Sequence, residues 1–252
     1  MKVFFIGAGP GAKDLITVRG ARILGEAQVV LYAGSLVAEE VLEFCQDSAE
    51  IINTAGIDLE EQMKLYEKAR AADQIVARLH SGDPAIYGAV AEQMRRLDEL
   101  GIEYEVVPGV STFCSSAASL KCELTKPGIA QSIIITRAEG RASSMPEGES
   151  LESLASHGTT MAIFLSGARL PETVEALRKH YPEETRVALV QKNEWPEEKR
   201  HQSTLGQLLD EIRPSDWRLS TMLLVGDVLG VEGGDSRLYD PVYSHHFRKG
   251  RR

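Results

Sequence analysis

A glycine-rich turn, Gly7-Ala8-Gly9-Pro10-Gly11, directly follows the apolar run Val3–Ile6. A turn of this kind between a strand and a helix binds dinucleotides when an acidic residue about 20 positions later holds the ribose. The next apolar run ends in Leu31-Tyr32-Ala33-Gly34 and offers no carboxylate, and Pro10 removes one backbone N–H from the turn. The sequence therefore argues against NAD or FAD binding.

Three further turns place small and hydroxyl-bearing residues after apolar runs, at residues 32–36, 80–88 and 107–112. Asp83 is expected to cap a helix that has Pro84 in its first turn. Ser35 and Ser111 are candidate caps in the other two turns. Because open α/β sheets bind ligands beyond the carboxyl ends of their strands, these turns predict one lip of a cleft for a flat or bulky ligand.

Other chemistries find no support in the sequence. It has no GxSxG motif, no HExxH motif and no cysteine pair at zinc spacing. The isolated Cys45, Cys114 and Cys122 are expected to be small buried apolar residues rather than disulfide partners. The adjacent His245 and His246 are expected to be solvated, so we expect no metal site.

The charge balance excludes some partners and leaves others open. Acidic residues number 37 against 28 Lys and Arg, which gives a net charge of −9 and argues against bulk binding of nucleic acid or anionic membranes. A few cations inside a cleft can still bind an anionic small substrate. Arg137 is favoured for this role, because it follows an apolar strand-like run and Arg pairs bidentately with a carboxylate. The candidate cations by position are Lys13, Arg19, His80, Arg137 and Arg141.

Hydrophobic periodicity predicts alternating strands and helices, which is typical of an α/β fold. In the first half we expect strands at 3–6, 29–32, 75–79 and 102–106, and helices at 14–25, 59–72, 86–100 and 112–120. After a linker at 124–128 we expect strands at 132–136, 160–165, 186–190 and 222–226, helices at 172–180 and 205–212, and a surface loop at 138–150. The prediction is two consecutive α/β domains, at 1–115 and 126–232, followed by a basic tail at 233–252.

The location of the protein in the cell is also an expectation from the sequence. No apolar run approaches the ~20 residues that span a bilayer. The N-terminal residues run straight into a strand-like pattern without the features of a signal peptide. We therefore expect a cytoplasmic protein.

Taken together, these segments resemble the tetrapyrrole methylase family, whose members use S-adenosylmethionine to methylate uroporphyrinogen and the precorrins. The resemblance extends from Val3 to about Gly230. LYAGSLV, HSGDPAIYG and TRAEGR are most similar to the branch that methylates precorrin-4 at carbon 11, whereas uroporphyrinogen and sirohaem members more often show a glycine pair before the Asp-Pro. The segments that carry it are GAGPGAKDLITVRG (7–20), VVLYAGSLV (29–37), RLHSGDPAIYGAVAEQ (78–93), VPGVST (107–112), IIITRAEGR (133–141), IFLSG (163–167), QKNEWPEEKR (191–200) and TMLLVGDVLG (221–230).

The resemblance implies a two-domain α/β fold with S-adenosylmethionine in the cleft between the domains, and a homodimer. The cofactor is expected to contact Pro10, Ser81, Gly82, Asp83, Ile86, Ser111, Thr112, Leu165, Asn193 and Met222. At Asn193 the sequence departs from the family, which commonly has a smaller residue there. The tetrapyrrole is expected to contact Gly9, Gly11, Ser35, His80, Tyr87 and Arg137.

The implied chemistry needs neither a metal nor a redox cofactor, because the sulfonium is already an activated methyl donor. The protein must mainly hold the acceptor carbon, the methyl group and the sulfur in line. No general base is assigned from the sequence. Two alternatives remain open: methylation of a different acceptor, such as another tetrapyrrole carbon or the modified histidine of elongation factor two, and a non-enzymatic module that binds S-adenosylmethionine.

Overall fold

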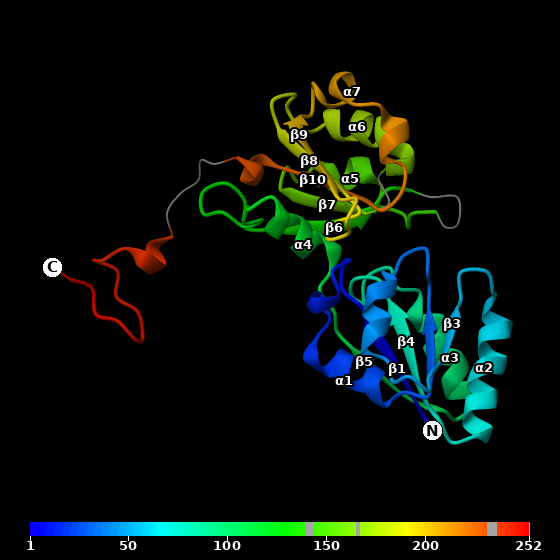
Figure 1. Cartoon of the computed structure of the whole chain (residues 1–252). Helices are drawn as coiled ribbons and strands as arrows, with labels where there is room; N and C mark the ends of the chain where they lie inside the picture. Colours follow the sequence, from blue (N-terminus) through cyan, green and yellow to red (C-terminus); the bar gives the residue numbers. More distant parts are fainter. Residues whose placement is uncertain (140–143, 165–166, 231–235, 252) are drawn as a thin grey trace. The chain divides into compact units, whose positions relative to one another are not determined.

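The computed structural model describes residues 1–139, 144–164, 167–230 and 236–251 (Figure 1). The chain divides into two compact units, and each has its own sheet with helices. The first unit contains Met1–Ser115 and Lys192–Glu198, and the second contains Ser116–Gln191 and Lys199–Arg252. The α/β class predicted from the periodicity is confirmed, and a short stretch from the second half of the chain belongs to the first unit.

The sheet of the first unit is fully parallel, in the order β3-β2-β4-β1-β5. Its strands are β1 (Lys2–Gly7), β2 (Val29–Tyr32), β3 (Glu50–Asn53), β4 (Ile75–His80) and β5 (Glu103–Val107). Gly7 pairs with His80, and Ile6 pairs with Val107. The turns that follow β1, β4 and β5 therefore leave the sheet side by side, at its carboxyl edge.

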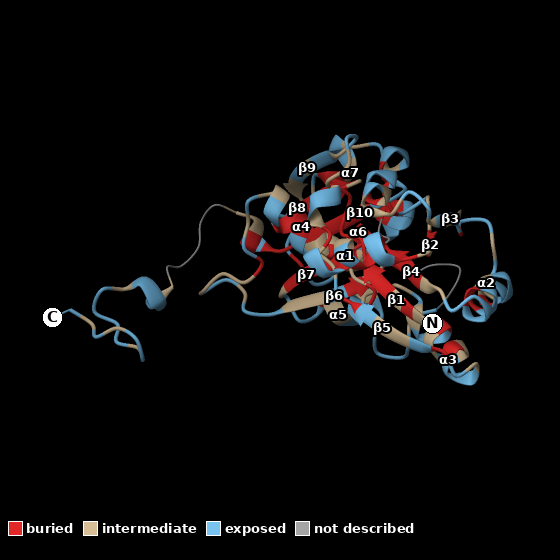
Figure 2. Ribbon diagram, turned by 60° about the horizontal axis from the view of Figure 1, so that its bottom comes forward, coloured by how far each residue is buried: buried red, intermediate tan, exposed pale blue. Residues whose placement is uncertain are grey.

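Helices cover both faces of this sheet because side chains along each strand alternate between the faces. Phe5 packs in one cluster with Tyr66 and Leu97, whereas Ile6 packs in another with Leu24, and all five side chains are fully buried. Burying such a side chain contributes about 1.5–3 kcal/mol. Figure 2 shows β1 and β4 as buried strands. The helices of this unit are α1 (Val18–Glu26), α2 (Leu59–Ala71) and α3 (Val90–Glu99), with 3-10 turns η1 (Lys13–Leu15) and η2 (Glu39–Phe44). Helix α4 (Thr112–Ser119) begins in the first unit and ends in the second.

The second unit has a mixed sheet in the order β6-β7-β10-β8-β9. β6 and β7 are parallel, whereas β10 runs antiparallel to both β7 and β8, and β9 pairs antiparallel with β8. The strands are β6 (Ile133–Arg137), β7 (Thr160–Phe164), β8 (Arg186–Gln191), β9 (Lys199–Thr204) and β10 (Thr221–Val225). Among the antiparallel pairs, β8 and β9 are joined by a short connection, residues 192–198, which parallel strands cannot use.

One apolar cluster holds the second unit together. Helix α6 contributes Leu170, Val174 and Leu177, whose spacing places them on one helix face, and they pack with Ile163 and Leu223 of the sheet. No helix among the described residues is long and apolar enough to cross a bilayer. The helices are α5 (Leu151–Ala155), α6 (Leu170–Arg178) and α7 (Leu208–Glu211), with 3-10 turns η3 (Gly167–Arg169), η4 (Pro214–Trp217), η5 (Asp227–Leu229) and η6 (Arg237–Tyr239).

Several helix boundaries differ from the prediction. The helix expected at 14–25 begins only at Val18, because the Thr17 hydroxyl caps it by accepting a hydrogen bond from the Gly20 N–H at 3.1 Å. The helix expected at 86–100 begins at Val90, because residues 84–87 form a separate turn. The helix expected at 205–212 shrinks to the four residues of α7.

Three elements were not predicted: the edge strands β3 and β9 and the short helix α5. β9 reads Lys-Arg-His-Gln-Ser-Thr and contains no aliphatic residue that would signal a strand. Polar residues are common on edge strands, where they discourage pairing with other chains. The segment expected as a linker is anchored in the second unit, where Leu124 accepts a hydrogen bond from Thr160 Oγ1 at 3.0 Å.

Candidate active site

Three glycines, Gly7, Gly82 and Gly109, meet at the carboxyl edge of the first sheet, and no side chain fits at Gly7 or Gly109. A β-carbon on Gly7 would lie 2.5 Å from Gly109 Cα, and one on Gly109 would lie 2.1 Å from the Gly82 carbonyl oxygen. Only glycine permits such close approach of backbone to backbone. The turns after β1, β4 and β5 therefore offer backbone N–H and C=O groups at this edge.

Hydrogen bonds join the glycine loop (Gly7–Gly11) to the turn after β4. Ala8 N–H donates to the His80 carbonyl at 2.8 Å, and Gly9 and Gly82 exchange two backbone bonds of 3.3 and 2.7 Å. Both glycines have positive φ, +81° and +64°, which a side chain would strain. The predicted cofactor residues Pro10, Ser81 and Gly82 are thus brought together.

Asp83 ties the turn after β4 to the turn after β5. Its Oδ1 accepts a hydrogen bond from the Ala85 N–H at 2.8 Å, and its Oδ2 accepts one from the Gly109 N–H at 2.9 Å. The expectation that Asp83 caps a helix is wrong, because the four residues that follow it form a turn and α3 begins later. Its carboxylate fixes the relative position of two strand ends instead.

The segment between this turn and α3 has a strained backbone. Tyr87 and Ala89 have φ of 55° and 51°, and a β-carbon on Gly88 would lie 2.3 Å from the Pro84 carbonyl oxygen. Non-glycine residues in this left-handed region cost free energy and concentrate at functional sites. The predicted contact residues Ile86 and Tyr87 both lie in this segment.

His80 is buried and neutral. Burial, together with the nearby Arg78 charge, lowers the pKa of His80 to about 3, although a hydrogen bond to the Gly88 backbone opposes the shift. The suggestion that His80 supplies a cation is therefore wrong. Its Nε2 is buried without a hydrogen-bond partner. The pKa of Arg78 is itself lowered by burial, and its guanidinium donates to Thr54 Oγ1 at 2.7 Å.

The remaining predicted hydroxyl residues of the first unit lie in two places. Ser111 is buried, and its carbonyl accepts hydrogen bonds from Cys114 and Ser115 as α4 begins at Thr112, next to the turn after β4. Ser35 is exposed in a turn, and it does not cap a helix as expected, because Ala38 is the residue that precedes η2.

The connection between β8 and β9, residues 192–198, packs on the glycine loop within the first unit. The Trp195 indole N–H donates to the Pro10 carbonyl at 3.1 Å. A β-carbon on Gly11 would lie 2.5 Å from Trp195 Cδ1 and 2.7 Å from the Asn193 carbonyl oxygen. Asn193 is only 2% exposed, and its Oδ1 is buried without a hydrogen-bond partner. The structure therefore brings Asn193 together with Pro10 and Gly11, and adds Trp195, which the sequence analysis missed.

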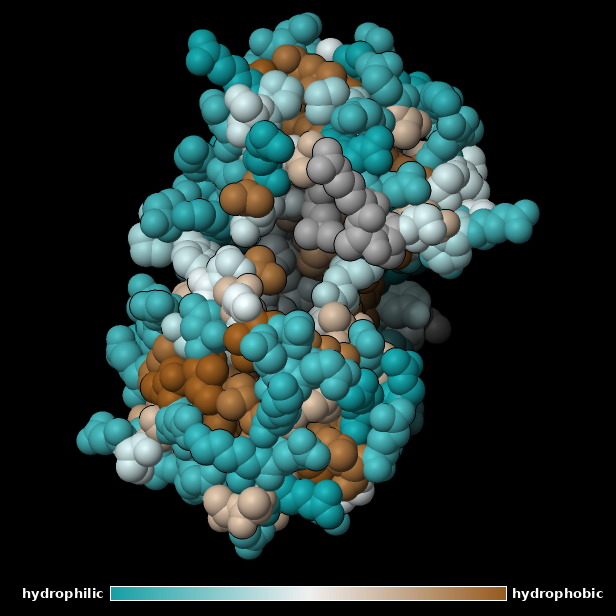
Figure 3. Space-filling view, turned by 90° about the vertical axis from the view of Figure 1, so that its right-hand side faces the viewer, coloured by the Kyte–Doolittle hydropathy of each residue, from teal (hydrophilic) through white to brown (hydrophobic). Residues whose placement is uncertain are grey.

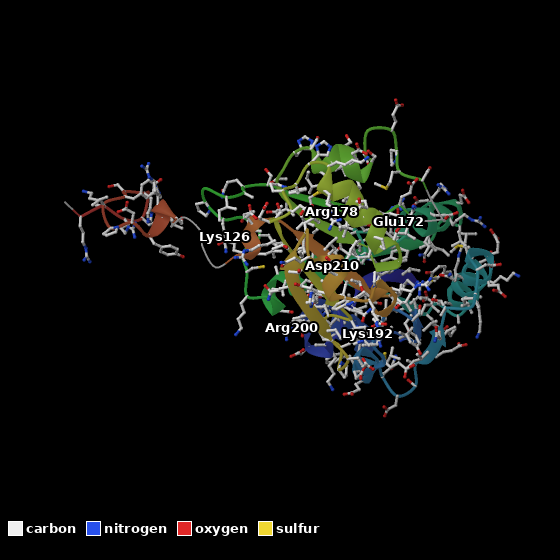
Figure 4. The ribbon with its side chains drawn as sticks, turned by 90° about the horizontal axis from the view of Figure 1, so that it is seen from above. Lys126, Glu172, Arg178, Lys192, Arg200 and Asp210 are labelled. Atoms are coloured by element: carbon white, nitrogen blue, oxygen red, sulfur yellow. The ribbon has the colours of Figure 1, made fainter. Side chains whose placement is uncertain are left out.

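The second unit holds the other predicted residues. Met222 is buried in β10, paired with Val190 of β8, and Leu165 lies outside the described residues. Arg137 ends β6, where it donates to the carbonyls of Ala138 and Ser144 at 3.4 and 3.3 Å. It lines a cavity of about 400 Å³ with Arg169 and with Glu172 of α6. Glu172 is labelled in Figure 4.

Two other candidate cations are exposed and lie beside carboxylates. Lys13 pairs with Glu43, and Arg19 lies 3.8 Å from Glu105. Such exposed pairs contribute little to stability.

The face in Figure 3 is mostly hydrophilic, with hydrophobic side chains in separate patches. Arg141 lies outside the described residues. Among the residues that the structure describes, no group of three or more His, Cys, Asp or Glu side chains could hold a metal ion.

Two α/β units, with closely packed glycine turns at the carboxyl edge of a parallel sheet, define an α/β protein of the class that binds ligands at that edge. The chain belongs to the tetrapyrrole (corrin/porphyrin) methylase family, whose model matches residues 2–209. The resemblance found in the sequence is confirmed.

Individual relatives are similar over nearly the whole chain. The precorrin-4 C(11)-methyltransferase of Pseudomonas aeruginosa is 47% identical over 251 residues, which are 99% of this chain and 100% of the relative. The structure of the cobalt precorrin-4 methyltransferase CbiF matches with a TM-score of 0.87 and 41% identity, covering 90% of this chain and 95% of that one. Uroporphyrin-III C-methyl transferase from Thermus thermophilus, complexed with S-adenyl homocysteine, matches with a TM-score of 0.77 and 27% identity, covering 92% and 100%.

Proposed function

We propose that this protein transfers the methyl group of S-adenosylmethionine to carbon 11 of precorrin-4, or of its cobalt complex, in the biosynthesis of the cobalamin corrin ring. The observation that carries the proposal is the full-length relationship to a precorrin-4 C(11)-methyltransferase at 47% identity. The similarity to cobalt precorrin-4 methyltransferase supports the same substrate class and leaves the metal content of the ring open.

The groups at the carboxyl edge of the first sheet fit S-adenosylmethionine. The glycine turns bring backbone groups close together at this edge, and these groups can bond adenosine and amino-acid groups. The unpartnered Oδ1 of the buried Asn193 can accept a hydrogen bond from an amine or hydroxyl of the ligand. The residues proposed to hold the cofactor are Pro10, Ser81, Gly82, Asp83, Ile86, Ser111, Thr112, Leu165, Asn193 and Met222.

S-adenosylmethionine supplies a methyl group on a positively charged sulfur, so the chain itself need not activate the donor. The residues of this chain bind and orient the methyl donor and the tetrapyrrole, and they exclude water from the site. The neutral His80 can accept a hydrogen bond through Nε2, but a pKa of about 3 makes it a weak proton acceptor at neutral pH. We therefore assign it to substrate positioning and assign no general base.

The tetrapyrrole is proposed to lie against the glycine loop and the strained segment before α3. The residues proposed to contact it are Gly9, Gly11, Ser35, His80, Tyr87 and Arg137. We further propose that the binding cleft forms between domains at residues 1–115 and 126–232, that residues 233–252 are a separate tail, and that the protein works as a cytoplasmic homodimer. The mass of the protein in solution, measured by light scattering, tests the dimer.

The test is to supply methyl-labelled S-adenosylmethionine with precorrin-4 and with cobalt-precorrin-4, and to locate the labelled carbon in the product by NMR. We expect the label on carbon 11, with faster turnover of one of the two substrates. A label on another carbon, or turnover of uroporphyrinogen III instead, would contradict the proposed acceptor. Tight binding of S-adenosylmethionine without turnover of any of the three tetrapyrroles would support a binding module.

A further inference from the structure

The segment from Lys192 to Glu198 is held in one conformation by its own contacts. The Glu198 carboxylate accepts hydrogen bonds from Asn193 Nδ2 at 3.0 Å and from the Glu194 N–H at 2.7 Å. Trp195 N–H donates to the Lys192 carbonyl at 3.0 Å, and Lys192 Nζ, labelled in Figure 4, lies 5.7 Å from the centre of the Trp195 ring. Lys192 and Glu194 also have φ of 48° and 64°, a conformation that needs support from its surroundings.

This segment contacts the far end of the glycine loop, at Pro10 and Gly11. Ala8 and Gly9 are held on one side by the turn after β4. Beyond them, the Pro10 carbonyl accepts the Trp195 indole N–H, and Gly11 lies against the Trp195 ring and the Asn193 backbone. Because glycines lose more conformational freedom than other residues when they are ordered, a second point of attachment matters for this loop.

We propose that Trp195 is a positioning residue, which holds the Gly7–Gly11 loop in the shape that receives the tetrapyrrole. The inference rests on the proposed function, because it takes this loop as part of the tetrapyrrole site. A loop that is already ordered before binding does not lose conformational entropy when the substrate binds. Trp195 acts through Pro10, a proposed cofactor contact, and Gly11, a proposed tetrapyrrole contact, so its removal weakens binding of both ligands.

Trp195→Phe tests this role, since it removes the indole N–H and keeps an aromatic ring against Gly11. Loss of one neutral hydrogen bond corresponds to about a two- to tenfold change in an equilibrium constant. We expect the KM for precorrin-4 and the Kd for S-adenosylhomocysteine both to rise by this factor, with kcat within about twofold of the parent. Hydrogen exchange of the amides of residues 7–11 should also become faster.

Trp217→Phe is the matched control, because Trp217 is the other of the two tryptophans and lies in the core of the second unit. It should lower stability without changing the KM or the exchange of residues 7–11. Unchanged exchange in Trp195→Phe would overturn the attachment of the loop, and faster exchange with an unchanged KM would overturn its role in substrate binding. If the parent protein does not methylate precorrin-4, the proposed function fails, and the hydrogen-exchange result still decides whether Trp195 orders the loop.

Discussion

A single carboxylate, that of Asp83, connects two turns that lie 26 residues apart in the sequence. It accepts one hydrogen bond from each turn, from Ala85 and from Gly109. Hydrogen bonds to a charged acceptor contribute about 1.5–3 kcal/mol each. The proposed cofactor residues on both turns therefore depend on Asp83 for their spacing, whether or not the carboxylate itself touches the ligand.

The variant Asp83→Ser should weaken binding of S-adenosylhomocysteine by about tenfold or more, because a serine hydroxyl is too short to accept both N–H groups. Calorimetric titration measures the affinity. Asp58→Ser is a matched control, since Asp58 caps α2 by accepting the Glu61 N–H at 2.9 Å. Serine also caps well, so the control should keep both stability and affinity. An unchanged affinity in Asp83→Ser would show that the spacing of the two turns is set by other contacts.

His80 makes the stability of the first unit depend on pH. Its pKa is about 3 in the folded protein and near 6.5 in the unfolded chain. Between these values the unfolded chain binds more protons, so stability is full above pH 6.5 and is lost as the pH falls towards 3. The slope from this one group is at most about 1.4 kcal/mol per pH unit.

Urea unfolding between pH 7 and pH 4.5 should show a shallower decline of stability for His80→Gln than for the parent. His157→Gln, at an exposed position of the second unit, should leave the decline unchanged. Equal slopes for all three proteins would mean that the imidazole becomes protonated without unfolding.

At the scale of elements, the start of α3 carries strain that can be removed. Ala89 precedes the helix with φ of 51° and is exposed. Glycine adopts this conformation freely, whereas an L-residue pays about 1–2 kcal/mol for it. Because glycine also gains freedom in the unfolded chain, Ala89→Gly should stabilise the protein by about 0.5–1 kcal/mol net, measured by thermal or urea unfolding. Ala85→Gly, in the same segment but without a positive φ, should destabilise it. A loss of stability in both variants would contradict the strained start of the helix.

The elements that the sequence predicts are those whose side chains face an apolar core. β1, β2 and β4 read as apolar runs because both faces of each strand are covered. β9 lacks that signal because it lies at a sheet edge, and α3 begins later than its periodicity suggests because the preceding turn uses left-handed residues. In the candidate site, the glycine loop and the turn after β4 could be found from local patterns. The bonds from Asp83 to Gly109 and from Trp195 to Pro10 could not, since they join residues 26 and 185 positions apart.

At the scale of the whole molecule, the net charge of −9 opposes a substrate that carries several carboxylates. The two opposing effects act over different distances. Repulsion from the distributed acidic surface acts over long range and is largely screened once the Debye length falls to about 10 Å, at 0.1 M salt. Attraction between a bound carboxylate and a contacting cation such as Arg137 acts at a few ångströms and is screened only at higher salt, where the Debye length approaches about 3 Å at 1 M. Substrate binding should therefore respond to salt in two opposite ways.

We expect the KM for precorrin-4 to fall as salt rises from about 0.01 to 0.1 M and to rise again towards 1 M, with the minimum near the concentration at which long-range repulsion is screened. Steady-state kinetics over this range measures the curve.

Arg137→Ala should raise the KM by about ten- to hundredfold, the loss expected for a charge-assisted pair, and should flatten the rising part of the salt curve. Arg169→Ala is the matched control, because Arg169 lines the same cavity but is not among the residues proposed to contact the substrate. Its KM and salt dependence should stay close to those of the parent. A KM that falls continuously up to 1 M salt would show that no cation of this chain contacts the substrate carboxylates, and an unchanged KM in Arg137→Ala would remove Arg137 from the proposed site.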